Sequence, residues 1–153
     1  MAAVLAGGPG AVLSHRSAAE LWSLLDGFTG PIHLTAPCRR RARRGICFHR
    51  SILPDDERTK VEGIPVSTVP RTVLDCSEAM PERRVERLIN EADVLRLHNR
   101  LSLPDLPHRY PGRSGSRKLS QALQKRNAGS TRTRSEIEEL LIELSATAAV
   151  IAG

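Results

Sequence analysis

Apolar residues recur at helical spacing near the start of the chain. Within residues 14–25, the apolar positions from Ala18 to Leu25 line one side, and this spacing predicts an amphipathic helix. Residues 2–6 predict the end of another helix, because the glycines and the proline of residues 7–10 would terminate it.

After this helix the apolar positions change to a period of two, which is typical of strands. Ile-His-Leu-Thr at residues 32–35 and Ile-Cys-Phe-His at residues 46–49 predict two strands, which the Arg-rich residues 37–45 would connect as a hairpin. Residues 58–67 place a Glu-Gly dipeptide between two short runs and predict a second hairpin. Pro65 restricts its strand to an edge or an end. We therefore expect a small antiparallel sheet of two hairpins.

The second half of the chain has a helical pattern. Thr68 predicts the N-cap of a short helix over residues 69–76, and a longer helix follows Pro81, with an apolar stripe that reaches Leu95. Four further segments are expected, namely a short helix over residues 102–106, a linker over 111–115, a basic helix over 116–124 and a loop over 127–130.

A strong helix start follows at residue 131. Thr133 with Glu136, or Ser135 with Glu138, fits the spacing of a capping box. The apolar residues that come next repeat as a face that requires a partner. A helix of this kind is typical of the first element of a domain. The sequence therefore predicts an α+β chain with its sheet in the first half, its helices in the second half and an incomplete C-terminal domain.

Positive charge is concentrated in two segments of a chain whose formal charge is +6. Residues 38–50 hold six arginines and residues 106–135 hold eight Lys or Arg, with no acidic residue in either segment. Such a distribution is typical of contact with a polyanion, although solvated loops would have the same composition. Because the chain has no recognition-helix signature and no aromatic platform, we expect little sequence preference. The candidate nucleic-acid-binding residues are Arg39, Arg40, Arg41, Arg43, Arg44, Arg113, Arg117 and Lys118.

No residue spacing predicts a metal site, a cofactor or a catalytic centre. The three cysteines match no metal or redox motif and are expected to be free thiols, and the five scattered histidines are expected to be structural or exposed. The acidic run at residues 55–57 is expected to form a solvated turn, and Arg71 and Asp75 to pair across one helical turn. The glutamates of residues 136–143 lie on one predicted helix and lack the partners that metal-assisted cleavage needs.

The N-terminus gives no targeting signal. It has no basic region ahead of its apolar residues, and glycine and proline interrupt it early, so we expect neither a signal peptide nor a membrane span. A cytoplasmic location follows as the expectation. Aromatic residues make up only 3% of the chain, so its core must be built from Leu, Val, Ile and Ala.

Six segments, in this order, resemble one large actinobacterial family. They are residues 11–22, 32–35, 45–51, 63–68, 71–75 and 133–138, which include Ser-His-Arg-Ser-Ala-Ala, Gly-Ile-Pro-Val-Ser-Thr and Thr-Arg-Ser-Glu-Ile-Glu. The family is that of the AbiEi-like antitoxins of type IV toxin–antitoxin systems. Many of its members carry a C-terminal domain of unknown function that is related to the very-short-patch-repair endonuclease. The resemblance covers roughly residues 1–144.

The resemblance implies three regions: a central α+β region over residues 1–110, a basic linker and short helix over 111–130, and the first helix of a nuclease-like domain, with an atypical tail, over 131–153. It also implies that this chain lacks the DNA-binding winged helix at one end and the catalytic strands at the other. Glu136 or Glu138 would lie in the opening helix of the nuclease-like domain. The partners that it implies are nucleic acid and a cognate toxin or its gene region.

Three functional hypotheses follow. The first is a non-catalytic, truncated AbiEi-like protein that binds nucleic acid or a partner through its arginines. The second is the front part of a very-short-patch-repair-like endonuclease that lacks its catalytic strands. The third is a degenerate reading frame without an independent function. We expect no enzymatic activity and no cofactor.

Overall fold

A five-stranded mixed sheet forms one side of the protein in the computed structural model, which describes residues 1–27, 29–95, 97 and 103–152. The strand order is β3-β2-β1-β5-β4. The strands are β1 (Val12–Leu13), β2 (Ile32–Ala36), β3 (Ile46–Arg50), β4 (Arg58–Val61) and β5 (Ile64–Ser67). The α+β class and the placement of the sheet in the first half are as the sequence predicts.

The prediction of a purely antiparallel sheet is wrong. Strands β2 and β3 run parallel, with Ile32 opposite Ile46 and Ala36 opposite Arg50, and β1 also pairs with β5 in parallel. Alternation identifies which side chains share a face but does not determine strand direction. Residues 37–45 are therefore a crossover between parallel strands and not a hairpin tip.

The second hairpin is confirmed. Strands β4 and β5 pair antiparallel, and the two residues between them, Glu62 and Gly63, have φ values of 50° and 77°. Positive φ at both positions is the requirement of a type I′ turn. Contrary to expectation, β5 is an interior strand despite Pro65. Only one residue pair, Leu13 with Val66, connects β5 to β1, so Pro65 interrupts no long ladder on that side.

The first four helices begin close to the predicted residues but have other ends. They are α1 (Ala2–Gly7), α2 (His15–Leu21), α3 (Val69–Ala79) and α4 (Glu82–Val94). Helix α2 ends before the predicted residue 25 because Ser23 adopts a left-handed conformation with φ 59°. Helix α3 continues three residues past the predicted end at Cys76, and of these only Ser77 is buried. Ser102, the predicted cap of the next helix, lies outside the described residues, and α5 spans Asp105–Arg109.

Helix α3 is the centre of the core. It packs against α2, α4, α5 and α6 (Ser114–Ala152), and nearly all of its residues are buried. The largest buried apolar side chains are Leu, Ile, Val and Met, close to the aliphatic core predicted from the scarcity of aromatic residues. Trp22 lies at the border of this core, where its indole nitrogen donates a hydrogen bond to the Ser67 carbonyl at 2.9 Å.

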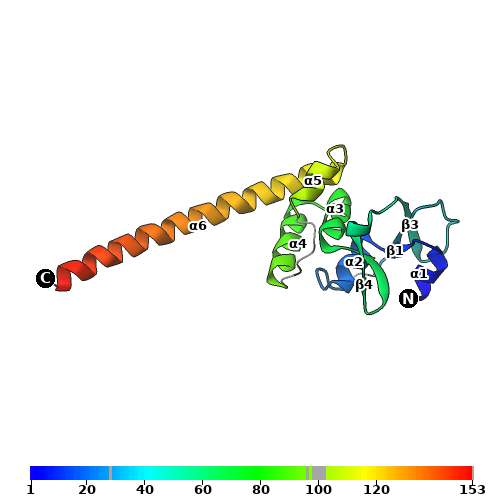
Figure 1. Ribbon diagram of the computed structural model, residues 1–153, viewed down its shortest axis with the longest axis horizontal. Helices are drawn as coiled ribbons and strands as arrows, with labels where there is room; N and C mark the ends of the chain where they lie inside the picture. Colours follow the sequence, from blue (N-terminus) through cyan, green and yellow to red (C-terminus); the bar gives the residue numbers. More distant parts are fainter. Residues whose placement is uncertain (28, 96, 98–102, 153) are drawn as a thin grey trace.

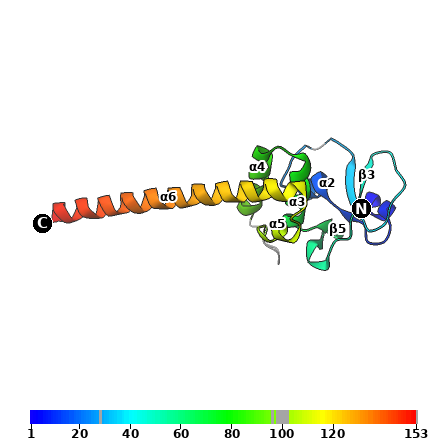
Figure 2. The ribbon, with the colours of Figure 1, turned by 90° about the horizontal axis from the view of Figure 1, so that it is seen from above.

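Helix α6 is continuous, and the predicted loop at residues 127–130 is wrong. The predicted capping boxes at Thr133 and Ser135 therefore lie inside a helix, where Thr133 donates to the Gly129 carbonyl. The first turns of α6 pack on α3 and α4, whereas every described side chain from Gln124 to Ala148 is exposed. Figures 1 and 2 show this part of the helix extending away from the rest of the chain. The predicted apolar face is present and contacts solvent, with Ile137 at 52% exposure.

Two glycines of α6 provide a matched test of this packing. A Cβ on Gly115 would lie 2.7 Å from the Leu74 carbonyl oxygen, whereas a Cβ on Gly129 would meet nothing within 4 Å. We expect Gly115→Ala to lower the free energy of unfolding by about 1–3 kcal/mol through overpacking. Gly129→Ala should have no destabilising effect, because alanine favours an exposed helix by about 0.5–1 kcal/mol. Urea unfolding of both variants checks this, and equal effects would contradict the packing.

Candidate functional site

The parallel pair of strands places four polar side chains on one face of the sheet. His33 and Thr35 alternate along β2, Cys47 and His49 alternate along β3, and the register puts His33 opposite Cys47 and Thr35 opposite His49. Opposed residues of neighbouring strands point to the same face. His15, the first residue of α2, lies over this patch.

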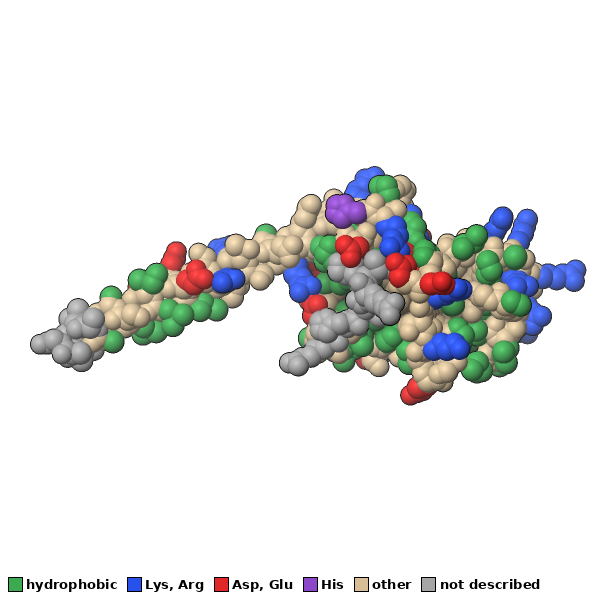
Figure 3. Space-filling view, in the orientation of Figure 1, with side chains coloured by type: hydrophobic (Ala, Val, Ile, Leu, Met, Phe, Trp, Pro, Cys, Tyr) green, Lys and Arg blue, Asp and Glu red, His purple; other side chains and the backbone are tan. Residues whose placement is uncertain are grey.

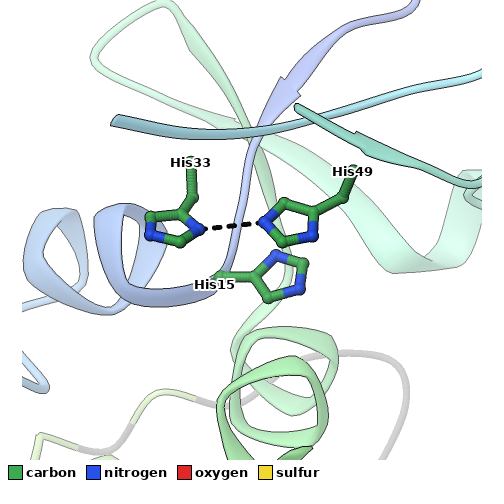
Figure 4. Close-up of side chains that lie close together, drawn as sticks. All are labelled: His15, His33 and His49. Atoms are coloured by element: carbon green, nitrogen blue, oxygen red, sulfur yellow. Dashed lines mark hydrogen bonds between the residues drawn. The ribbon is translucent and has the colours of Figure 1, made fainter. Parts of the chain in front are cut away.

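The three histidines meet although they are far apart in the sequence (Figure 4). His33 Nδ1 lies 2.9 Å from His49 Nε2, and the rings of His15 and His49 stack with 3.6 Å between their centroids. One ring nitrogen from each of the three residues lies within 4.8 Å of the other two. Cys47 Sγ borders the group, 3.6 Å from His49 Nε2.

Hydrogen bonds hold the start of α2 against β2. The Ser14 amide donates to the His33 carbonyl at 3.0 Å, and the His33 amide donates to Ser17 Oγ at 2.9 Å. The buried Ser14 hydroxyl accepts from Thr35 at 2.8 Å and lies 3.0 Å from His15 Nδ1. His15 itself has φ 52°, a left-handed conformation that is uncommon for a residue with a Cβ. The backbone is thus held in a strained form at the residue that reaches the other two histidines.

All three imidazoles favour the neutral form. Burial lowers the pKa of His15 from 6.5 to about 2, and the neighbouring His49 and His33 lower it further in the same direction. Burial also lowers the pKa of His33 and of His49. Neutral imidazole keeps one ring nitrogen with an available lone pair. At neutral pH all three rings are therefore uncharged, and the 2.9 Å contact between His33 and His49 places the ring proton of one of them between the two nitrogens.

A buried network of ion pairs lies beside the histidines. Arg71, only 3% exposed, donates to Glu57 Oε2 at 2.7 Å and to Asp75 Oδ1 at 2.9 Å. Glu57 Oε1 accepts from Arg109 and from the Tyr110 hydroxyl, each at 2.7 Å. The predicted pair of Arg71 and Asp75 is confirmed. The prediction of a solvated turn at residues 55–57 is wrong for Glu57, which is fully buried because two arginines and a tyrosine neutralise its charge and satisfy its oxygens.

Asp75 connects this network to the histidines. Its Oδ1 accepts from Arg71 and from Arg113, each at 2.9 Å, whereas its buried Oδ2 has no hydrogen-bond partner among the described residues and lies 4.0 Å from His15 Nδ1. Burial raises the pKa of Asp75, although both arginines oppose the shift. Asp75 therefore places a buried carboxylate oxygen beside the histidine cluster.

An open hollow of about 580 Å³ lies over His15 and His49. Its polar wall includes Arg50, Arg71, Glu78 and Arg113. A second hollow of about 370 Å³ shares Phe48, His49 and Arg50 with the first and is also lined by Arg39 and Arg40. The cationic surface is therefore continuous from the crossover at residues 37–45 to the histidine cluster.

The five candidate arginines of the crossover do not all have the same surroundings. Arg39, Arg41, Arg43 and Arg44 are exposed, and none of the ion pairs of the described residues includes them. Arg40 is half-buried against the end of α1, where a Cβ on Gly8 would lie 2.7 Å from Arg40 Nη2. Figure 3 shows Lys and Arg side chains projecting at the end of the molecule opposite the tip of α6.

The other three candidates lie elsewhere and differ in role. Arg113 pairs with Asp75 and with Glu78, the latter at 2.7 Å, and is a part of the buried network. Lys118 donates to the carbonyl oxygens of Glu78 and Met80 and so caps the end of α3. Arg117 is exposed on α6. Of these three residues, Arg113 alone lines the larger hollow, together with Arg50.

The predicted nuclease-type glutamates remain apart from the site. Glu136 and Glu138 are exposed on the extended part of α6, where they pair with Arg132 and Arg134 one turn earlier, at 3.2 Å. Both glutamates lie on one helix, as the sequence predicts. The remaining histidines do not join the cluster: His108 is exposed on α5, and His98 lies outside the described residues.

Sequence reasoning missed the histidine cluster because it considered only spacing along the chain. A usable signal was present, since His33 and His49 both occupy polar positions of alternating strands. Comparison with known proteins adds no further assignment: no protein-family model matches this chain, and no curated protein matches it.

Proposed function

We propose that this protein binds nucleic acid through the crossover at residues 37–45, without sequence specificity. The observation that supports this most is the group of four exposed arginines, Arg39, Arg41, Arg43 and Arg44, which have no carboxylate partner among the described residues. Guanidinium groups left unpaired at one end of a molecule attract phosphates and release condensed counterions.

The surroundings extend the same surface. Arg50, at the end of β3, lines both hollows that flank the crossover. The pairing of β2 with β3 fixes both ends of the crossover, so the arginines lie on a segment that is anchored at each end. Contacts of this kind fix the position of a duplex without reading its bases.

The resemblance to AbiEi-like antitoxins supports a regulator of this type but not the crossover as its contact surface, because such proteins bind DNA through an N-terminal winged helix. We propose a non-catalytic regulator of this type that acts in the cytoplasm, with a cognate toxin or its gene region as a further partner. The exposed positions of Glu136 and Glu138 favour a binding role over magnesium-dependent cleavage, because carboxylates from several elements must converge to hold a cation.

Charge-removal variants test the proposal. Replacing Arg39, Arg41, Arg43 and Arg44 together by Gln should weaken binding of a short duplex DNA by about 10²-fold at low salt, because four phosphate contacts are lost. The measurement is fluorescence anisotropy with the full chain.

The matched control removes the same charge elsewhere, by replacing the exposed Lys60, Arg83, Arg84 and Arg87 by Gln. This variant should bind within a few-fold of the wild type. Equal losses in the two variants would mean that only net charge matters, and that result would exclude the crossover as the binding surface.

A further inference from the structure

The histidine cluster is a second feature of this protein that bears on its function. His15, His33 and His49 come from α2, β2 and β3, and one nitrogen of each lies within 4.8 Å of the others. Zinc–imidazole bonds of about 2.0–2.1 Å place two tetrahedral ligand nitrogens about 3.3 Å apart. The 2.9 Å between His33 Nδ1 and His49 Nε2 is already close to that separation.

Coordination of a metal ion would require the stacked ring of His15 to rotate. Its centroid lies 3.6 Å from that of His49, and the planes differ by 15°. A face-to-face sandwich is not the arrangement that aromatic rings prefer, so rotation of one ring is not opposed by strong stacking.

We propose that His15, His33 and His49 bind one divalent ion of the zinc class, with a fourth coordination position open to the neighbouring hollow. Imidazole nitrogen suits Zn²⁺, Co²⁺, Ni²⁺ and Cu²⁺, whereas Mg²⁺ and Ca²⁺ require oxygen ligands. Ser14 Oγ lies 3.0 Å from His15 Nδ1 and helps to fix the orientation of this ring. The orphaned Asp75 Oδ2 adds negative charge 4.0 Å from the same ring.

The ion would add a further connection between elements that backbone pairing and a few side-chain hydrogen bonds already join. His33 and His49 lie on the two strands that flank the crossover, and β3 is an edge strand. A bound ion would therefore fasten the edge strand to β2 and to the start of α2. This inference does not depend on nucleic-acid binding, and its test contains no DNA.

The experiment is a calorimetric titration of the chelator-treated full chain with Zn²⁺, with Mg²⁺ titrated in parallel. We expect one Zn²⁺ per chain, a higher thermal midpoint with excess Zn²⁺, and no response to Mg²⁺. Co²⁺ should produce the visible absorption of a tetrahedral site. No binding of Zn²⁺, or equal binding of Mg²⁺, would overturn the site.

Variants identify the ligands. His33→Ala and His15→Asn, the latter chosen because asparagine tolerates positive φ, should each weaken Zn²⁺ binding at least about tenfold, whereas the exposed His108→Ala should not. Far-ultraviolet circular dichroism without metal shows whether each variant folds, and either folded variant suffices. Cys47→Ser should retain one ion per chain. Loss of binding in Cys47→Ser, with none in the histidine variants, would overturn the three-histidine assignment.

Discussion

Arg71→Met should lower the free energy of unfolding by about 3–5 kcal/mol, because it leaves two buried carboxylates without their shared cation. Arg71 lies between Glu57 and Asp75, at 2.7 and 2.9 Å, and both acids are fully buried. It also lies 5.2 Å from the centroid of the Tyr110 ring, above its face. Methionine replaces the aliphatic part of the side chain but neither of its hydrogen bonds to carboxylate oxygen.

Chemical denaturation measures this change. The control is Arg126→Met, which removes an exposed ion pair with Asp93 and should cost less than about 1 kcal/mol. Adding Glu57→Gln to Arg71→Met should cost less than the sum of the two single changes, because one unpaired charge is then absent. If Arg71→Met were no worse than Arg126→Met, the buried network would not be a major source of stability.

Cys76 should react with a thiol reagent about 10³-fold more slowly than an ordinary thiol at pH 8. Burial raises the pKa of Cys76 from 9.0 to about 12, with the Asp75 charge acting in the same direction. The reactive thiolate is thus about a thousandfold rarer at any pH below the ordinary pKa. Raising the pH should increase the rate about tenfold per unit, up to the shifted pKa.

Labelling followed by peptide mass analysis compares Cys76 with the exposed Cys38 in the same molecule. Cys38 should be modified first, and Cys76 much later, because the Cys76 thiol is buried and its pKa is raised. In denaturant the two should react at similar rates. Rapid modification of Cys76 in the native protein would show that α3 is not the closed centre of the core.

The elements that depend on local sequence pattern are predicted correctly. The Glu-Gly turn, the apolar stripe of α4 as far as Ala92 and the strand positions at residues 32–35 and 46–49 follow from spacing and turn chemistry, and the structure confirms them. Leu95, the predicted end of the stripe, lies beyond α4 and is exposed. Strand direction is different, because alternation is the same in parallel and antiparallel pairs. The continuity of α6 through residues 127–130 also depends on more than local composition, since Asn and Gly only weakly oppose a helix.

The site was predicted only in part, for a related reason. A segment rich in arginine and poor in apolar residues is expected at the surface of any fold. Arg39 and Arg41 are exposed, as this composition predicts. Arg113 is different, because its partners Asp75 and Glu78 approach only after α3 and α6 pack. The histidine cluster depends on the parallel register of β2 and β3, which no spacing along the chain encodes. Buried Glu57 is a similar case, since two of its partners, Arg109 and Tyr110, lie more than fifty residues later.

The most direct test of the central claim, that the arginine crossover is a surface for nucleic acid, is the affinity of the wild-type chain for duplex DNA measured across salt concentrations. With four or five phosphate contacts, the logarithm of the affinity should fall against the logarithm of salt with a slope of about −4. The slope should be nearly flat once Arg39, Arg41, Arg43 and Arg44 are replaced. Binding that does not respond to salt, or a slope that those replacements leave unchanged, would contradict the claim.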